Sequence, residues 1–140
     1  MSAIHSDATK VAAWEKFTVI SRGGGWSTIQ TSSGHFLTAV GGGGKVTDVI
    51  HSDSTKMGDW EKFKIVKQPG GWVAIQTYDG HYLTAVGGGG RNTDTIHSDA
   101  KTIGQWEKFR LVPLGKQIYA IQTHSGNYLT AVNGGGAASD

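Results

Sequence analysis

Short runs of apolar and β-branched residues, separated by glycine and polar turns, recur along the whole chain. In the middle of the sequence, residues 71–77 and 81–86 have the composition of strands, joined by a Tyr78-Asp79-Gly80 turn. Residues 93–97 predict a third strand, and residues 106–112 a fourth that stops at Pro113. With 22 Gly and only 2 Pro in 140 residues, the chain leaves little room for helices.

The pattern is an internal repeat of 46 residues without insertion or deletion. Ile-His-Ser-Asp begins at Ile4, Ile50 and Ile96, and every other motif keeps the same step. The other motifs are Trp-Glu-Lys-Phe from Trp14, Trp60 and Trp106, Ile-Gln-Thr from Ile29, Ile75 and Ile121, and Leu-Thr-Ala-Val from Leu37, Leu83 and Leu129. Because polar loop residues recur together with apolar ones, the repeat suggests one surface chemistry built three times.

Four short strands in each repeat limit the choice of fold. A propeller blade also has four strands, but propellers typically close with about four to eight blades. Three four-stranded units close instead as a β-trefoil, a six-stranded barrel capped by three hairpins. We therefore expect an all-β protein, a β-trefoil with internal pseudo-threefold symmetry.

A single domain, residues 1–140, is expected to hold three units. The first unit spans residues 25–70 and the second residues 71–116. The third begins at residue 117 and ends at residue 140, and its missing half is residues 1–24. The third unit is thus predicted to be formed by both termini.

Alternation of residues along each strand separates predicted core from predicted surface. The tryptophans of Trp-Glu-Lys-Phe could be platforms for sugar stacking, but their position three residues before a core Phe favours plugs over the barrel end. The predicted core residues are Phe17, Phe63, Phe109, Val19, Ile65, Leu111, Ile29, Ile75, Ile121, Leu37, Leu83 and Leu129.

The Ile-His-Ser-Asp motif supplies the candidate site. If Ile50 points inward, His51 and Asp53 both point outward, close to the glycine run that follows the previous strand. Backbone N–H and C=O groups of such a run are not shielded by side chains. The candidate sugar-binding residues are His5, Asp7, His51, Asp53, His97, Asp99, Gly41, Gly42, Gly43, Gly87, Gly88, Gly89, Gly134 and Gly135.

Two interpretations of this motif fit its spacing. Asp53 could cap a turn while His51 bonds to the backbone. Alternatively, the carboxylate could accept two hydroxyls of a sugar and the imidazole could add a third hydrogen bond. Turn chemistry does not require histidine, so its presence in all three repeats favours sugar binding.

Two families of trefoil proteins resemble this chain. Gly-His-Tyr-Leu-Thr-Ala-Val from Gly80 and the Trp-Glu-Lys-Phe motif are similar to the Gly-X-Tyr-Leu-Thr-Ala and Trp-Glu-X-Phe signatures of fascin-like domains. The chain also resembles the mytilectins, mussel lectins with three sites for α-galactosides. Their units carry aromatic-Leu-His-Pro-X-Gly-Gly and then His-X-Asp-X-His, which Tyr82-Leu83, Gly87-Gly88 and His97-Ser98-Asp99 match in part.

The mytilectin resemblance implies three sugar sites with a preference for galactose or GalNAc. The sequence departs from that pattern at the His-Pro pair, which is Thr-Ala here, and at the final His, which is Thr9, Thr55 or Lys101. Trp26 and Trp72 have Ile118 as their third equivalent, so the repeats are not identical on the surface.

Charge and composition limit the classes of partner and the location that we expect for this protein. The net charge of +2 is scattered without a basic block, so no nucleic-acid partner is expected. The start of the chain lacks the features of a signal peptide, and no apolar run reaches membrane-spanning length. We expect a cytoplasmic protein, or one released by a non-classical route, that is a monomer or weak homodimer without membrane insertion.

Neither catalysis nor a metal or other cofactor is expected. Glu15, Glu61 and Glu107 could be general acids, but their place between Trp and Lys favours salt-bridged structural residues. The His-X-Asp spacing supplies two of the three ligands of a non-haem iron site, and no third ligand follows it. The sequence therefore predicts a trivalent lectin for glycoprotein or glycolipid glycans. The alternative is a fascin-like module that binds actin or another protein.

Overall fold

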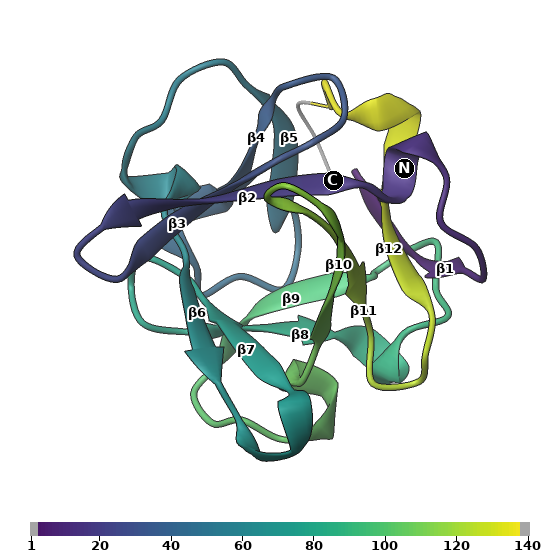
Figure 1. Cartoon of the computed structure of the whole chain (residues 1–140). Helices are drawn as coiled ribbons and strands as arrows, with labels where there is room; N and C mark the ends of the chain where they lie inside the picture. The colour runs from purple at the N-terminus through teal and green to yellow at the C-terminus, as the bar shows by residue number, and fades with distance from the viewer. Residues whose placement is uncertain (1–2, 138–140) are drawn as a thin grey trace.

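The computed structural model describes residues 3–137, and it is built from short strands joined by tight turns (Figure 1). Among these residues there is no α-helix, only single 3-10 turns of three residues. The strands are β1 (Ile4–Ala8), β2 (Phe17–Gly23), β3 (Trp26–Gln30), β4 (Phe36–Ala39), β5 (Ile50–Ser54), β6 (Lys64–Lys67), β7 (Val73–Gln76), β8 (Tyr82–Ala85), β9 (Ile96–Ala100), β10 (Arg110–Gly115), β11 (Ile118–Gln122) and β12 (Tyr128–Ala131).

Six of these strands close a barrel. Strand β2 pairs with β3, β6 with β7, and β10 with β11 as antiparallel hairpins. Three shorter pairings join the hairpins: Ser27 with Phe63, Val73 with Phe109, and Tyr119 with Phe17. At the first pairing, the two backbone N–H···O=C bonds measure 2.7 and 2.8 Å. A closed barrel leaves no unpaired strand edge among these six strands.

The other six strands form the three hairpins outside the barrel. Strand β4 pairs with β5, β8 with β9, and β1 with β12 (Figure 1). The last pair joins the beginning of the described chain to its end, with Ile4 opposite Ala131. The chain is thus a β-trefoil whose third unit is formed by both termini.

Local differences from the predicted strands arise at the Trp-Glu-Lys-Phe motif and at Pro113. Trp106 lies in the 3-10 turn η6 (Gln105–Glu107), and β10 begins only after Phe109. That strand continues past Pro113 to Gly115, and Pro113 is opposite Tyr119 in the ladder. Proline is therefore not the end of the strand.

The core contains the residues that the repeat predicts. The side chains of Phe17, Phe63 and Phe109 are fully buried, and every member of the two sets of Ile and the set of Leu is at most 5% exposed. Val19, Ile65 and Leu111 are only half-buried and pack against this core. Burial of this threefold apolar set gives the trefoil its main stabilisation.

The expectation that the tryptophans plug the barrel is wrong. Trp14, Trp60 and Trp106 are 45%, 48% and 48% exposed. Each lies in a 3-10 turn, η1 (Ala13–Glu15), η3 (Asp59–Glu61) or η6, where strand alternation does not apply. The turn directs the next residue, the glutamate, inward in place of the indole.

The glutamate of this turn is structural, although it is not salt-bridged as the sequence suggests. Glu61 is 8% exposed. Its Oε1 accepts a hydrogen bond from the Gly58 N–H at 2.7 Å, and its Oε2 accepts one from the Thr38 hydroxyl at 2.5 Å. Glu15 and Glu107 make the same contacts, with Thr130 and Thr84 respectively. The carboxylate therefore ties each turn to the neighbouring hairpin strand.

The glycine runs join each unit to the next. Gly44 N–H donates to the Ser98 carbonyl at 2.6 Å, and Ser98 N–H donates to the Lys45 carbonyl at 2.8 Å. The same pair of contacts recurs from Gly90 and Arg91 to Ser6, and from Gly136 and Ala137 to Ser52. The three serines, the central residues of His-Ser-Asp, are 0% exposed. The units thus bind one another in cyclic order through the backbone.

Close approach at these contacts requires glycine. A Cβ on Gly43 would overlap the side-chain oxygens of Thr77 and Asp79 in the next unit. Gly89 and Gly135 meet Thr123 and Thr31 in the same way. The φ of Gly43 is +121°, which side chains rarely adopt. Both the backbone conformation and the space therefore exclude other residues.

Substitution of Gly43 by alanine is expected to destabilise the protein more than the same change at Gly80. Gly80 also has a positive φ, +94°, but a Cβ there meets nothing within 4 Å. Gly80→Ala should cost roughly 1–2 kcal/mol of unfolding free energy from backbone strain alone. Gly43→Ala should cost about 1–3 kcal/mol more, because it adds the overlap. Urea unfolding of the two variants measures this difference, and equal losses would contradict the close-approach argument.

Candidate functional site

The candidate site in the first unit centres on a histidine–carboxylate pair. His51 is on β5, and its Nε2 lies 2.7 Å from Oδ1 of Asp48, three residues earlier. The side chains are 24% and 50% exposed. Asp48 has a φ of +49°, a conformation that aspartate tolerates better than most residues. This turn places the carboxylate beside the imidazole that follows it on the strand.

The second unit repeats the pair. His97 Nε2 lies 2.8 Å from Asp94 Oδ1, and Asp94 has a φ of +48°. Arg91 adds a longer contact, 3.8 Å, to the other carboxylate oxygen of Asp94. In the third unit, the histidine is His5, and Ser2 and Asp140, one from each terminus, both correspond to Asp94 and lie outside the described residues.

The exposed tryptophan of each unit covers a glycine of the adjacent loop. A Cβ on Gly42 would lie 3.6 Å from Cδ1 of Trp60 and 3.7 Å from its Nε1. Gly88 meets Trp106, and Gly134 meets Trp14, at nearly the same distances. The absence of a side chain on the glycine therefore allows the indole to lie against the backbone while about half of its surface stays in solvent.

Contacts on one side of the β4–β5 hairpin connect the indole to the histidine. Glu61, which follows Trp60, accepts the Thr38 hydroxyl, and Thr38 is directly opposite His51 in the ladder. Side chains directly opposite in an antiparallel pair lie on the same face of the sheet. Trp60 precedes this glutamate in the turn and lies against Gly42, in the loop between β4 and β5. We call Trp60, His51 and Asp48 of this unit the Trp-His-Asp face. In the second unit it consists of Trp106, His97 and Asp94.

A hollow lies beside the indole in the third unit. It has a volume of about 220 Å³ and is lined by Ala12, Ala13, Trp14 and Glu15. The ring of a pyranose is of a size to rest against such a surface, with one face on the indole.

The histidine ring contacts a different aspartate from the one that the sequence predicts. His51 and Asp53 are both more exposed than Ser52 between them, as strand alternation predicts. However, Thr38 pairs with His51 and Phe36 with Ser54, so Asp53 lies at an irregularity in the ladder. The contact of the His51 ring is with Asp48, which precedes the strand. Asp7 and Asp99, the equivalents of Asp53, are exposed.

Most of the predicted glycines have a structural role that the sequence did not reveal. The Gly42 carbonyl accepts the Asp79 N–H at 3.0 Å, and Gly88 and Gly134 do the same for Ser125 and Ser33. Gly43, Gly89 and Gly135 lie against threonines of the next unit. Only Gly41 and Gly87, the first glycines of their runs, are exposed on the surface among the predicted set.

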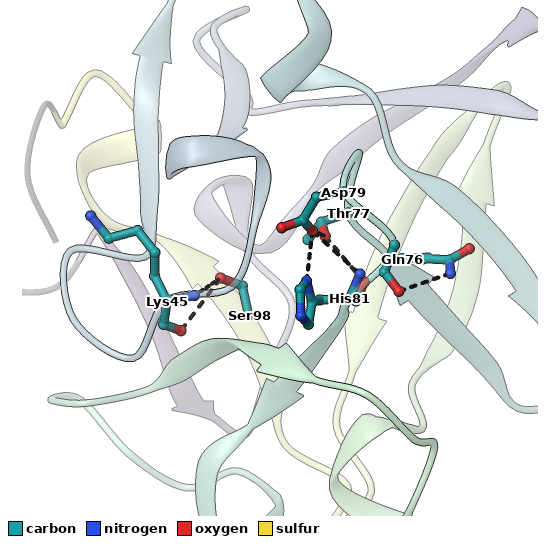
Figure 2. A network of polar contacts seen from close by, with 7 residues as sticks. Lys45, Gln76, Thr77, Asp79, His81 and Ser98 are labelled. Atoms are coloured by element: carbon teal, nitrogen blue, oxygen red, sulfur yellow. Dashed lines mark hydrogen bonds and ion pairs between the residues drawn. The ribbon is translucent and has the colours of Figure 1, made fainter.

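At the junction between the first two units, the glycine run lies beside the Thr77–Asp79–His81 turn (Figure 2). Burial of Asp79 by itself raises the pKa of its carboxyl. A 2.6 Å hydrogen bond from the Thr77 hydroxyl and the contacts of the His81 ring and N–H outweigh this effect, so the pKa of Asp79 lies below its ordinary value of 3.8. The His81 Nδ1 contact, at 2.9 Å, is an ion-pair distance rather than a well-directed hydrogen bond.

Three features of the site could have been found in the sequence. Aspartate recurs at 48, 94 and 140, the same step as the other motifs, and aspartate is common in turns. The serine of His-Ser-Asp also recurs and must face the barrel side if its neighbours face out. Glycine at 58 and 104 indicates the turn that holds the tryptophan, although it does not indicate the direction of the indole.

Within residues 3–137, no three histidine or acidic side chains are grouped so as to hold a metal ion. In the same part of the chain, no helix is long and apolar enough to cross a membrane.

Comparison with known proteins supports the fold alone. No protein-family model matches the chain, and no curated protein matches it. Among solved structures, the chain is similar to the designed threefold symmetric protein ThreeFoil, with a TM-score of 0.62 and 17% identity. The match covers 70% of this chain and 71% of ThreeFoil. A threefold symmetric protein with this degree of structural similarity agrees with the trefoil built from three units.

The junction in Figure 2 predicts a dependence of stability on pH. Because folding lowers the pKa of Asp79, its contribution is present above the pKa of the unfolded chain, about 3.8, and is lost as the pH falls through the folded value. Asp79→Ser is the matched control, since Ser33 and Ser125 occupy this position in the other units. Between about pH 5 and pH 3, the parent should lose more unfolding free energy than this variant. Urea unfolding across this range measures both, and parallel losses would show that Asp79 contributes nothing specific.

Proposed function

We propose that this protein is a lectin that binds glycans through three equivalent sites, one on the Trp-His-Asp face of each unit. The observation that supports the proposal most is a half-exposed indole in the same unit as a histidine–carboxylate pair, an arrangement that recurs in the two units whose aspartate is described. Packing of the barrel does not require either feature: about half of the indole surface is in solvent, and the His51–Asp48 pair lies outside the core.

Each group on this face has a role in binding a pyranose. The C–H groups of one sugar face would stack on the ring of Trp60, which provides a large apolar surface at low entropic cost. Asp48 would accept hydrogen bonds from vicinal hydroxyls, and these charge-assisted bonds are stronger than neutral ones. His51 would add a donor or acceptor, and Asp48 fixes which ring nitrogen faces the sugar.

Galactose and GalNAc are the sugars we propose, on the basis of the mytilectin resemblance. Thr38 stands where the mytilectin pattern has histidine, and Glu61 engages its hydroxyl. The sugar would therefore be bound by Asp48, His51 and Trp60, without a hydrogen bond to Thr38. Exposed Gly41 could add a backbone group at the edge of the same face.

The arrangement favours binding over catalysis. Two acidic residues flank Trp60. Asp59 lies 3.7 Å from the Lys62 ammonium, and both oxygens of Glu61 already accept hydrogen bonds, from Gly58 and Thr38. A carboxylate held in this way is poorly placed to transfer a proton to a substrate. We therefore propose a non-enzymatic glycan-binding protein, whose three sites increase avidity for surfaces that present many glycans.

Loss of one tryptophan is expected to remove one of three sites. Trp60→Ala should weaken binding at the first site by about 2 kcal/mol, roughly thirtyfold, while the other two sites remain. Titration calorimetry with a galactoside would then count two sites where the parent has three. Leu114→Ala, which removes an exposed apolar side chain from the β10–β11 hairpin, is the control and should retain all three. A folded variant in which Trp14, Trp60 and Trp106 are all replaced by alanine, and which binds the galactoside as tightly as the parent, would exclude this face as the binding site.

A comparison of two aspartates decides which carboxylate binds the sugar. Asp48→Asn should weaken the first site by about 1.5–3 kcal/mol, because it removes a charged acceptor and the partner of His51. Asp53→Asn should change binding little, although the sequence motif alone favours this residue. If calorimetry shows instead that Asp53→Asn weakens binding and Asp48→Asn does not, Asp53 on β5 is the carboxylate that binds the sugar. If the parent binds no glycan on a broad array, the lectin proposal fails, and actin co-sedimentation then tests the fascin-like alternative.

A further inference from the structure

Aromatic and cationic side chains fill the space at two of the three places where barrel hairpins meet. Between β3 and β6, Trp26 stacks on Tyr78 with ring centroids 5.2 Å apart, and Lys64 Nζ lies 4.7 Å from the centre of a Trp26 ring. Tyr78 comes from the turn after β7, so this cluster joins the first unit to the second.

The second meeting place, between β7 and β10, has the same arrangement with different residues. Trp72 stacks on His124 at 4.9 Å, and the guanidinium of Arg110 lies 4.0 Å from the indole. The repeat thus places an indole, a second ring and a cation at equivalent positions.

At the third meeting place, between β11 and β2, all three groups are missing. Ile118 replaces the indole, Ser32 the second ring and Thr18 the cation, each 46 or 92 residues from its equivalents. The pairing of Tyr119 with Phe17 here is equivalent to the pairings of Ser27 with Phe63 and of Val73 with Phe109, and Ile118 also pairs with Thr18. A hollow of about 280 Å³ lies here, and Ile118, Ser32, Thr18, Gln30 and Lys16 are among the residues that line it.

Lys16 gives this hollow an unbalanced positive charge. In the first unit, the equivalent Lys62 lies 3.7 Å from a carboxylate oxygen of Asp59. In the third unit, Ala13 stands in place of Asp59, and Lys16 has no ion-pair partner among residues 3–137. An ammonium group at the edge of a partly apolar hollow favours an anionic ligand.

We propose that this hollow is a separate binding site for one small planar aromatic carboxylate. The two filled equivalents show that rings stack in the space that the barrel leaves here, and the side chain of Ile118 provides an apolar surface for a ring. Lys16 supplies the counter-ion for the carboxylate. The site occurs once in each molecule, and it does not depend on the proposed glycan sites, which occur three times.

Binding of indole-3-acetate, followed by NMR chemical shifts of the parent protein, tests the proposal. We expect one site with a dissociation constant on the order of a millimolar, as is usual for a ligand of this size. Backbone signals of Thr18, Ser32 and Ile118 should move, while those of the equivalent residues Lys64, Tyr78 and Trp72 should not. Neutral indole should bind about two- to fivefold more weakly, because one exposed charge pair contributes little, and acetate alone should not bind measurably.

Two sets of variants use the repeat as its own control. Ile118→Trp with Ser32→Tyr supplies the two rings of the first meeting place and should reduce affinity at least tenfold, since the hollow is filled. Trp26→Ile with Tyr78→Ser and Lys64→Thr should create a second hollow and a second site in a molecule that keeps the first.

The role of the charge is tested separately. Lys16→Gln should remove the preference for indole-3-acetate over indole and leave the affinity for indole unchanged.

Several results would overturn the proposal. Shifts confined to the surroundings of Trp14, Trp60 and Trp106 would mean that the ligand stacks on the exposed indoles instead. Unchanged affinity in the Ile118→Trp, Ser32→Tyr variant would exclude the hollow, provided that its unfolding transition matches that of the parent. Glycan binding of the same variant should remain intact, so failure of this site is distinguishable from failure of the lectin proposal.

Discussion

Contact between the units depends on the absence of a side chain at the third position of each glycine-rich run. Gly43, Gly89 and Gly135 let the backbone of one unit lie directly against the threonine of the next, where a Cβ would overlap it. The following residues then bond to the buried serine of the neighbouring hairpin. Because these contacts form a closed cycle of three, each unit is held by both of the others. Neither hydrophobic burial nor strand pairing alone specifies this register between hairpins.

This use of the glycine runs decides which groups remain for binding. The Gly42 carbonyl and the Gly43 N–H, like their equivalents in the other units, form hydrogen bonds within the protein, so they are not available to a ligand. The indole covers Gly42, Gly88 or Gly134, at the second position of each run, and remains half exposed. In the first unit, the histidine–carboxylate pair is His51 of β5 with Asp48. Structural and surface roles are thus divided among adjacent residues of the same motifs: Ser52 joins the units, whereas His51 faces outward.

Symmetry is strict where packing requires it and relaxed where it does not. The three Phe, the three Glu–Thr hydrogen bonds and the three serine contacts are nearly the same in every unit. The rings at the meeting places of the hairpins lie at the surface, and one of these places has lost them altogether. A repeated protein can therefore keep three copies of one surface and use a single departure from symmetry for a different ligand.

By itself, the sequence determined the trefoil, the strands of each unit, the joining of the termini and most of the core. These follow from the 46-residue step and from strand alternation, which can both be recognised from the order of the residues alone. Only the tertiary structure decided that Trp60 is exposed, that His51 pairs with Asp48, and that the glycine runs face the next unit. A 3-10 turn decides the direction of the tryptophan side chain. The left-handed backbone conformation of Asp48 brings its carboxylate to His51, and contacts between different repeats decide where the glycine runs lie. Each of these depends on backbone conformation or on residues distant in sequence, so alternation along one strand could not reveal it.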